Sequence, residues 1–540
     1  MKPRLFVVAS LALLVGAAAC SRPSPPSAGE RNAWTIPGVV RLGEDEEPDG
    51  LNLMYAHTAA SDAISGLLYS FILRYDAQGD YVPDLATRVP TLRNGDISRD
   101  GRQIVVHLRK GVVWADGAPL TAADWLFTYR LVRDPQTAVK STYGWDEIAS
   151  ASAPNPYTIV IRLRRASVRV LGILAMGGAG YPPLPLHLLA KIADLRQSGY
   201  NEHPLSSGPY VLKAWNHGSS LTFTPNPRYF RGAPKLKEVI WKVIPDVNTL
   251  LNELATHEVD VYPSVNANNV ARLSTIRGIA VTHRLSANWR HLGINLSRPQ
   301  LLDARVRRAI AEGVDWARIE HDVFHDLDRL AISDIFPQSW AAPKLPAYRY
   351  DPGDAKRLLE QAGWRPGLDG ILVKGPLAMR LTIYATTGHQ ENTESQVLIQ
   401  AMLRKIGIEI EVRNYPGSYL FAQNGPLYTG RYDLEWSIET NGPDPDNSGN
   451  WAGAFIPPRG ANTSWLNDPI VNATSLAAAS TFDENARKAL YQREEERIRY
   501  VVPAVFFSWQ TDYTAMNADL KNYVPAAFIG DTWNAWQWTI

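Results

Sequence analysis

Apolar and polar residues alternate with a period of two in four separate stretches of the chain. The first stretch, residues 104–109, reads Ile-Val-Val-His-Leu-Arg, and the others are residues 158–163, 221–224 and 408–412. A period of two places successive side chains on opposite faces of a sheet, because side chains project alternately from an extended strand. We therefore predict β-strands at these four positions.

A helical spacing of apolar residues marks a second set of elements. Residues 306–310, 355–362 and 393–406 carry apolar side chains at intervals of three and four. Gly363 and Gly407 closely follow two of these stretches, and glycine readily takes the left-handed conformation that ends a helix. The pattern predicts three helices, two of which end near these glycines.

A fourth helix start is predicted after a tight turn. Residues 114–119 read Trp-Ala-Asp-Gly-Ala-Pro, in which Asp and Gly are typical turn residues. Thr121 follows, with Asp124 three residues later, and this spacing is typical of a capping box with Asp in place of the more usual Glu. We read both features as structural and expect neither to contact a ligand.

One part of the chain predicts a parallel sheet. A short apolar strand at residues 381–384 is followed by the helix at 393–406 and the strand at 408–412. Two strands joined by a helix form a crossover unit, and its strands lie parallel with the helix packed on the sheet. The expected fold class is therefore mixed α/β.

Composition places the chain among ordinary large globular proteins. It has 540 residues, of which 45% are hydrophobic and 20% are charged. At about 150 residues per domain, this length suggests about three to four domain-sized units. The 55 basic residues are balanced by 54 acidic residues with no basic cluster, so we expect no nucleic-acid partner.

The cysteine count excludes several kinds of chemistry. Cys20 is the only cysteine in the chain, so neither an internal disulfide nor a thiolate metal site can form. Lys2 and Arg4 precede an apolar stretch at residues 5–19, which is the layout of an export signal. Fifteen apolar residues are too few to span a bilayer, which needs about 20.

The residues before the cysteine resemble a bacterial lipobox, in which the cysteine is acylated after cleavage. Three alanines precede Cys20, although Ala17 stands where that pattern usually has Leu. We expect a signal peptide at 1–19, lipidation at Cys20 and a Pro/Ser-rich tether at 20–32. The protein would be an exported periplasmic or cell-surface lipoprotein that touches the membrane through its lipid only. An ordinary secretory signal that is cut elsewhere is the alternative.

Several separated stretches, taken in order, resemble one known family. They include Trp114-Ala-Asp-Gly, Ser207-Gly-Pro-Tyr210 and His291-Leu-Gly-Ile-Asn295, and the full set covers residues 67–86, 106–125, 207–235, 291–315 and 350–364. Each stretch is weak alone, but the ordered set is similar to the cluster C, family 5 extracellular solute-binding proteins. That family is typified by the dipeptide- and oligopeptide-binding proteins of bacterial ABC importers.

The resemblance implies a two-lobed clamp of the type II periplasmic-binding-protein kind, with an extra inserted domain. Lobe I would comprise residues 33–75, 203–288 and 505–540. The inserted domain would occupy residues 76–202, and lobe II residues 289–504. Such a protein encloses its ligand between the lobes. We expect a monomer that captures di- or oligopeptides and delivers them to the permease subunits of an ABC importer.

The resemblance also indicates an anchor for the ligand ammonium. In the family, a strand that begins with Trp carries an acid three residues later. Counting forward from Trp436, through Ser437, places Glu439 at this position. Counting back from Asp444 places Asn441 there instead, and Asp444 is itself a candidate. A third interpretation is a solvated turn whose acids face water, in which case the ligand need not be a peptide.

Further ligand contacts are expected from loops and aromatic residues. By the resemblance, the loop from Tyr55 to Thr58 forms the facing edge of lobe I. His389 lies in the loop after the strand at 381–384, where it could meet a ligand carboxylate. Trp289 falls near the expected cleft or hinge, and an aromatic wall suits variable side chains.

Other functions fit the sequence less well. The same clamp could bind a sugar, an opine or a metal chelate, or could serve as a peptide-sensing receptor. A zinc hydrolase would use His321 and His325, but Asp322 is a poor replacement for the Glu of that motif. The acidic run at residues 44–47 lacks the ligand spacing of a calcium loop and is interpreted as a solvated loop. We predict no catalytic residue, no cofactor and no metal site.

Overall fold

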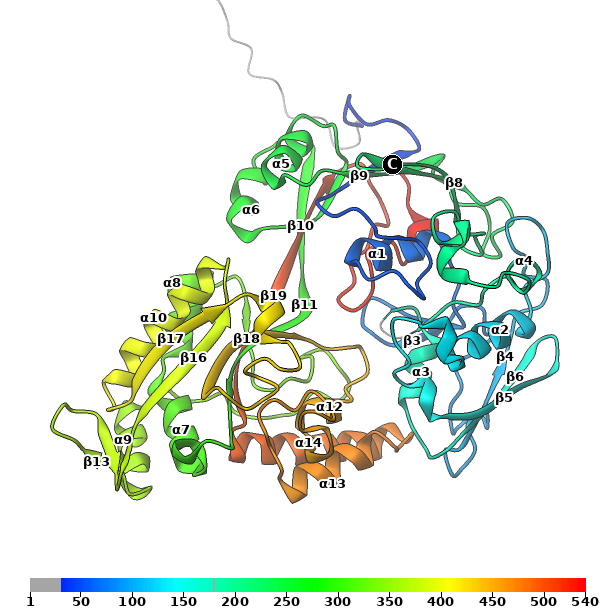
Figure 1. The fold of residues 1–540 in the computed structure, drawn as a ribbon. Helices are drawn as coiled ribbons and strands as arrows, with labels where there is room; N and C mark the ends of the chain where they lie inside the picture. Colours follow the sequence, from blue (N-terminus) through cyan, green and yellow to red (C-terminus); the bar gives the residue numbers. More distant parts are fainter. Residues whose placement is uncertain (1–30, 178–179) are drawn as a thin grey trace, which may run out of the picture.

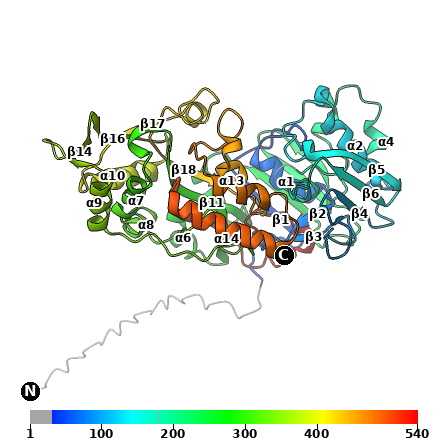
Figure 2. The same ribbon diagram turned by 90° about the horizontal axis from the view of Figure 1, so that it is seen from below.

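The computed structural model describes residues 31–177 and 180–540 of the chain. Two lobes lie side by side and are joined by long extended strands (Figures 1 and 2). The expected signal peptide, Cys20 and most of the tether lie outside the described residues. In the described part of the chain, no helix is long and apolar enough to cross a membrane.

A mixed sheet of 11 strands runs through both lobes. The strand order is β17-β16-β18-β11-β19-β10-β1-β9-β8-β7, and the short β12 pairs with β19. In this order the strands comprise Glu409–Tyr415, Arg380–Thr386, Leu434–Thr440, Ile279–Ile294, Ala504–Asn517, Val261–Val265, Val39–Glu44, Glu238–Val243, Ser220–Pro225 and Tyr210–Asn216, and β12 is Arg329–Leu330. The strand predictions at 221–224 and 408–412 are confirmed.

Two strands connect the lobes. β11 and β19 pair antiparallel from Ile279 opposite Asn517 to Gly293 opposite Ala504. Their register shifts between Leu285 and Trp289, and again between Arg290 and His291. The first part of β11 lies beside lobe I, whereas its last seven residues also pair with β18 of lobe II. β11 and β19 therefore run as paired strands from one lobe into the other (Figure 1).

The predicted crossover unit is present in lobe II. β16 and β17 pair parallel, and α10 (Gln390–Arg404) connects them. Gly407 has φ +87° and Gly363 has φ +90°, so both take the left-handed conformation expected after a helix. The apolar faces of α7 (Ala304–Gly313), α9 (Pro352–Gln361) and α10 pack in the core of this lobe.

The segment predicted as an inserted domain has a small sheet of its own. This sheet has the order β4-β6-β5, formed by Gln103–His107, Thr158–Leu163 and Ile148–Asn155. Its strands at 104–109 and 158–163 were predicted from alternation. Trp114 and Trp125 of this segment belong to the same apolar core as Val40 and Trp241 of lobe I. The segment is thus packed onto lobe I, and the domain boundaries remain a prediction.

The remaining elements complete the two lobes. Lobe I and the segment 76–202 carry α1 (Ala59–Leu68), β2 (Leu73–Tyr75), β3 (Tyr81–Pro83), α2 (Ala122–Arg133), α3 (Arg169–Leu174), α4 (Leu186–Leu189), α5 (Val247–Ala255) and α6 (Ala267–Leu273). Lobe II carries α8 (Trp316–Phe324), the β13-β14-β15 sheet (Arg365–Pro366, Leu372–Lys374, Leu377–Ala378), α11 (Gly417–Leu420), α12 (Ser448–Trp451), α13 (Pro469–Ala478) and α14 (Glu484–Val501).

The capping box at the start of α2 supports a stability prediction. The Thr121 hydroxyl accepts a hydrogen bond from the Ala123 N–H at 3.3 Å, and the Asp124 carboxylate accepts one from the Thr121 N–H at 2.8 Å. Thr121→Ala should lower the free energy of unfolding by about 1 kcal/mol, because an N–H in the first turn loses its acceptor. Urea unfolding measures this change. Thr121→Ser keeps the hydroxyl and is the control; equal losses in both variants would contradict the capping role.

Candidate functional site

Two cavities lie where the lobes meet, and a third cavity, lined by residues of lobe I alone, adjoins them; together they form the cleft. The first, here called the central cavity, has a volume of about 280 Å³. The second is lined by tyrosine and phenylalanine side chains, is called the aromatic cavity and has a volume of about 400 Å³. The third, whose charged lining groups are mainly carboxyl groups, is called the acidic cavity and has a volume of about 390 Å³. The central and acidic cavities share Asp62, Arg284, Ile529 and Gly530 as lining residues. The central and aromatic cavities share Gly177, Thr440 and Phe528. The three spaces are therefore neighbours, with the central cavity in the middle.

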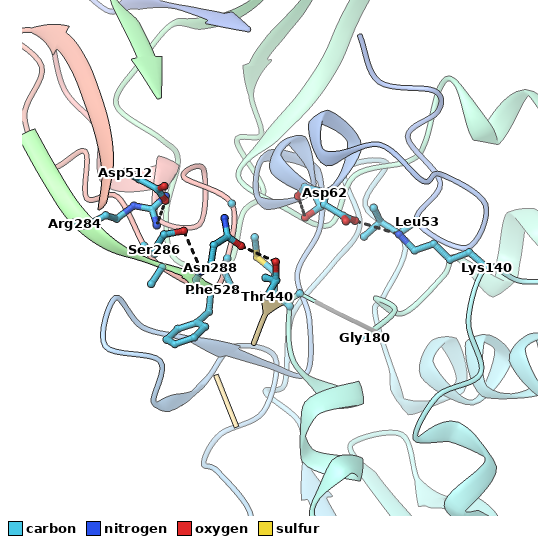
Figure 3. Close-up of a pocket in the computed structure, with 18 residues that line it drawn as sticks. Leu53, Asp62, Lys140, Gly180, Arg284, Ser286, Asn288, Thr440, Asp512 and Phe528 are labelled. Atoms are coloured by element: carbon cyan, nitrogen blue, oxygen red, sulfur yellow. Dashed lines mark hydrogen bonds and ion pairs between the residues drawn. The ribbon is translucent and has the colours of Figure 1, made fainter. Parts of the chain in front are cut away.

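Polar groups that bind one another line the central cavity (Figure 3). Lys140 lies 3.3 Å from the Asp62 carboxylate, and Arg284 lies 3.2 Å from that of Asp512. Across the lobes, the Thr440 hydroxyl donates to the side-chain oxygen of Asn288 at 2.6 Å. The cavity thus offers hydrogen-bonding groups whose charges are already paired.

Carboxyl groups dominate the acidic cavity. Glu44, Asp45, Glu46, Asp62 and Asp531 line it, with Arg284 as its basic residue. Burial raises the pKa of Glu44 to about 8, and the neighbouring Asp531, Asp45 and Glu46 act in the same direction. The interpretation of residues 44–47 as a solvated loop is therefore wrong for Glu44, which ends β1 and faces this cavity.

Aromatic side chains from one side of the cleft meet the loop after β18 in the aromatic cavity. Tyr75, Tyr81 and Tyr143 lie on one side, and residues 440–444 lie on the other. Phe528 completes the wall from the C-terminal segment. The cavity is thus built by parts of the chain that are far apart in sequence.

The predicted anchor Glu439 lies beside the cleft, in a small cavity of about 20 Å³. Trp289, His291, Glu435 and Glu439 are among its lining residues. Glu439 pairs with Trp289 across the strands, which places both side chains on one face of the sheet. Burial raises the pKa of Glu439; His291 opposes this shift, whereas Glu435 adds to it. The cavity has room for about one water-sized group.

Trp436 and Ser437 are neighbours on β18 but have different surroundings. Trp436 is 2% exposed and packs against Trp316 and Phe507 in the core of lobe II, so its expected contact with a ligand gains no support from its position. Ser437 is buried opposite His291 and lines none of these cavities. Strand alternation explains why Trp436 lies on the opposite face of the sheet from Ser437 and Glu439.

Asn441 and Asp444 line the aromatic cavity but are engaged within the protein. The Asn441 side-chain oxygen accepts a hydrogen bond from the Trp289 indole at 3.0 Å, and its amide donates to the Asp334 carbonyl. Arg487 holds the Asp444 carboxylate through two hydrogen bonds of 3.0 and 2.7 Å. Within the described residues, no hydrogen bond to the Glu439 carboxylate is found, so Glu439 is the more available acid.

The structure places three predicted contacts away from the cavities of the cleft. Thr58 caps α1 and accepts a hydrogen bond from the Ser61 N–H at 3.2 Å, next to the residues that line the acidic cavity. Tyr55 packs against the core of lobe I. His389 precedes α10, and its side chain is 57% exposed and 3.6 Å from Glu391. Contact of Tyr55 or His389 with a ligand therefore stays a prediction.

The zinc interpretation finds no support in the geometry. His325 lies at the end of α8 in the left-handed conformation, with φ +58°. His321 is exposed and lies 2.8 Å from Asp326. In residues 31–177 and 180–540, no group of three or more His, Cys, Asp or Glu side chains could hold a metal ion.

Several cleft residues were missed in the sequence because only the fold brings them together. Arg169, in α3, reaches across the lobes to the Asp446 carboxylate at 2.6 Å and to the Ser448 hydroxyl at 2.7 Å. The Val168 N–H also donates to the carbonyl of Ala479 at 3.0 Å. These contacts hold the lobes together beside the aromatic cavity. No local motif distinguishes Arg169 from an ordinary surface arginine.

Comparison with known proteins shows a match along most of the chain. The family described as bacterial extracellular solute-binding proteins, family 5 Middle, matches residues 80–456. The oligopeptide-binding protein AppA of Bacillus subtilis is 27% identical over 534 residues, which cover 96% of this chain and 95% of AppA. The similarity thus extends over nearly the full length of both proteins.

Solved structures show the same fold. The structure of Bacillus subtilis AppA in complex with a nonapeptide matches with a TM-score of 0.72 and 25% identity, and covers 93% of this chain and 99% of AppA. NikZ from Campylobacter jejuni in complex with Ni(L-His) matches with a TM-score of 0.76 and 25% identity, covering 94% of this chain and 100% of NikZ. The mixed α/β, two-lobed architecture predicted above is confirmed.

The raised pKa of Glu44 predicts how stability depends on pH. A carboxyl with a higher pKa in the folded protein stabilises it below the unfolded pKa, and this contribution is lost as the pH rises through the folded value. As the pH rises from 4.5 to about 8, the free energy of unfolding of the wild type should therefore fall, and that of Glu44→Gln should not show this fall. The difference should be on the order of 2 kcal/mol, measured by urea unfolding across this range.

An exposed acid on α10 provides the matched control. Glu394→Gln makes the same chemical change at an exposed position of that helix. Glu394→Gln should show the same dependence of the free energy of unfolding on pH as the wild type. If Glu44→Gln and Glu394→Gln give the same profile, the proposed effect of burial at Glu44 does not exist.

Proposed function

Because the chain belongs to the bacterial extracellular solute-binding proteins of family 5, we propose that it binds peptides in the cleft and delivers them to an ABC importer. The near full-length similarity to an oligopeptide-binding protein is the observation that carries this proposal. The role is capture and release of a ligand, without catalysis. Closure of two lobes around a ligand is a known motion of such clamps.

The size of the cleft favours oligopeptides over dipeptides. Each cavity, at about 280 to 400 Å³, is comparable with the lower end of ordinary ligand pockets, which begin at about 300 Å³. The three cavities share lining residues, so one extended ligand could occupy more than one of them. A peptide that lies along the cleft can bind through its main chain, which makes binding tolerant of sequence.

Glu439 is the proposed acceptor for the ligand ammonium. Its carboxylate lies on β18, directly before the residues that line the central and aromatic cavities. An ammonium group would satisfy a buried acid whose pKa is raised by burial and by Glu435. Asp444 is the weaker candidate, because Arg487 already occupies its carboxylate.

The family and the N-terminal sequence support a location outside the cytoplasmic membrane. Members of this family are extracellular solute-binding proteins. We place this chain at the outer side of a membrane as a lipoprotein attached at Cys20, with the ligand-binding lobes on a tether. In this arrangement a monomer meets the permease subunits while it remains near the membrane.

A metal chelate is the second candidate ligand. The solved protein NikZ, which has the same fold, carries Ni(L-His). In the present chain, the Nδ1 atom of His291 is buried and has no hydrogen-bond partner among the described residues. Because the described residues hold no metal-binding group of three side chains, such a metal would arrive with ligands of its own.

Thermal unfolding tests the ligand class. The purified protein, freed of ligand by unfolding and refolding, is heated with di- to pentapeptides, their N-acetylated forms and a nickel–histidine chelate. A ligand at 100 times its Kd adds about 2.7 kcal/mol of stability. Free peptides should raise the Tm more than acetylated ones do. Stabilisation by the chelate alone would replace the peptide proposal.

A charge-neutral variant tests the anchor. Glu439→Gln should weaken peptide binding by about 10- to 100-fold, because a charge-assisted hydrogen bond is worth about 1.5–3 kcal/mol. Isothermal titration measures this loss with free and N-acetylated peptides. Acetylation should cost the variant much less than it costs the wild type. If Asp444→Asn shows that pattern and Glu439→Gln does not, Asp444 is the anchor.

A further inference from the structure

The aromatic cavity has walls that suit an apolar side chain. Tyr75 is 4% exposed, and its ring lies 4.7 Å from that of Tyr81, centroid to centroid. The two hydroxyl groups are 3.1 Å apart and hydrogen-bond to each other. Each hydroxyl therefore has a partner inside the protein, and the ring surfaces remain to line the cavity with Phe528.

The charged groups of the aromatic cavity are paired with one another. Arg487 binds Asp444, and Arg169 binds Asp446 across the lobes. The Arg169 guanidinium also lies over the ring of Tyr143, 5.2 Å from its centroid. Two cations thus face two carboxylates, which leaves no unbalanced charge to attract a basic or acidic side chain.

Gly172 borders the cavity beside the two tyrosines. Gly172 lies in α3, and a Cβ atom built on it would be 3.7 Å from the hydroxyl oxygens of both Tyr75 and Tyr81. This distance is an ordinary contact, so a small side chain would fit and a longer one would project toward the tyrosines. Position 172 is therefore a place where a longer side chain can be tested against the tyrosine wall.

The cavity also opens where a bound ligand would pass. It shares Gly177, Thr440 and Phe528 with the central cavity, and its lining residues come from both sides of the cleft. A ligand in the central cavity can therefore place one side chain in the aromatic cavity. The volume of about 400 Å³ is sufficient for a large ring.

We propose that the aromatic cavity is a pocket for one bulky apolar side chain of the ligand, preferably an aromatic one, and that Gly172 and the tyrosines of residues 75 and 81 set this preference. The proposal rests on the proposed peptide-binding function and narrows its substrate class. It also gives residues 76–202 a part in ligand selection, through Tyr81, Tyr143 and α3. Ring stacking and loss of apolar surface from water provide the preference.

Peptide competition tests the preference. Pentapeptides of glycine and alanine with Phe, Leu, Lys or Glu at each position in turn compete for the purified wild type. At one position of the peptide, the pentapeptide with Phe should bind about 10- to 100-fold more tightly than the pentapeptide with Gly. This ratio is expected for burial of one aromatic side chain. Lys and Glu at that position should give no such gain.

Variants locate the preference in the cavity. Gly172→Leu should reduce the ratio of Phe-peptide to Gly-peptide affinity by at least about fivefold, because its side chain fills the space that the ring needs. Gly172→Ala is the matched control and should reduce the ratio less. Tyr81→Ala should also lower the ratio by removing a wall, and it tests the same pocket without filling it.

The remaining results separate failure of the pocket from failure of the proposed function. Equal affinity for Phe and Gly peptides at every position, a preference for Lys, or an unchanged ratio in both Gly172→Leu and Tyr81→Ala would overturn the pocket while peptide binding stands. If no peptide binds to the wild type, the proposed function itself fails, and the pocket proposal fails with it. Thermal unfolding without ligand identifies any variant that does not fold.

Discussion

The antiparallel pairing of β11 with β19 is the constraint on which the cleft depends. Both strands run through the two lobes, so the lobes share main-chain hydrogen bonds rather than a flexible linker. The register shifts between Leu285 and Trp289, which is where Ser286 and Asn288 line the central cavity. Such irregularities bend a strand and redirect its side chains. The site therefore forms where the shared strands change direction, and any closing motion must turn about this pair.

The pairing of β18 with β11 decides which residues can meet a ligand. Glu439 lies opposite Trp289, and Glu435 lies opposite Gly293, so both acids share the face that carries His291. Trp436 projects from the other face into the core. A slip of one residue would exchange these faces and bury the acid in an apolar environment. The packing of Trp436 therefore keeps Glu439 on the face of the sheet that carries Trp289, His291 and the small cavity.

Local patterns predicted the elements well because they depend on neighbours in sequence. The crossover unit at β16, α10 and β17 and the cap at Thr121 required only periodicity and spacing. The stretch after Trp436 is assigned to the ligand site only through its resemblance to a known family, and this assignment stays a prediction. The sequence could not show that Trp436 faces the core, nor that Arg169 reaches Asp446 from 277 residues away. Those positions depend on strand register and on packing between lobes, which no short pattern contains.

The charged groups that line the cleft differ in how well they are paired. Lys140 is paired with Asp62, and Arg284 lies between Asp512 and Asp531. In contrast, Glu44 has other carboxyls as its charged neighbours, and Glu439 has Glu435 near it. Placing a carboxylate among carboxylates destabilises the unliganded cleft, since burial and like charges both oppose ionisation. A cation placed beside these groups offsets the repulsion between them, although it does not return them to water. Under the proposed function, the ammonium group of the ligand supplies this cation.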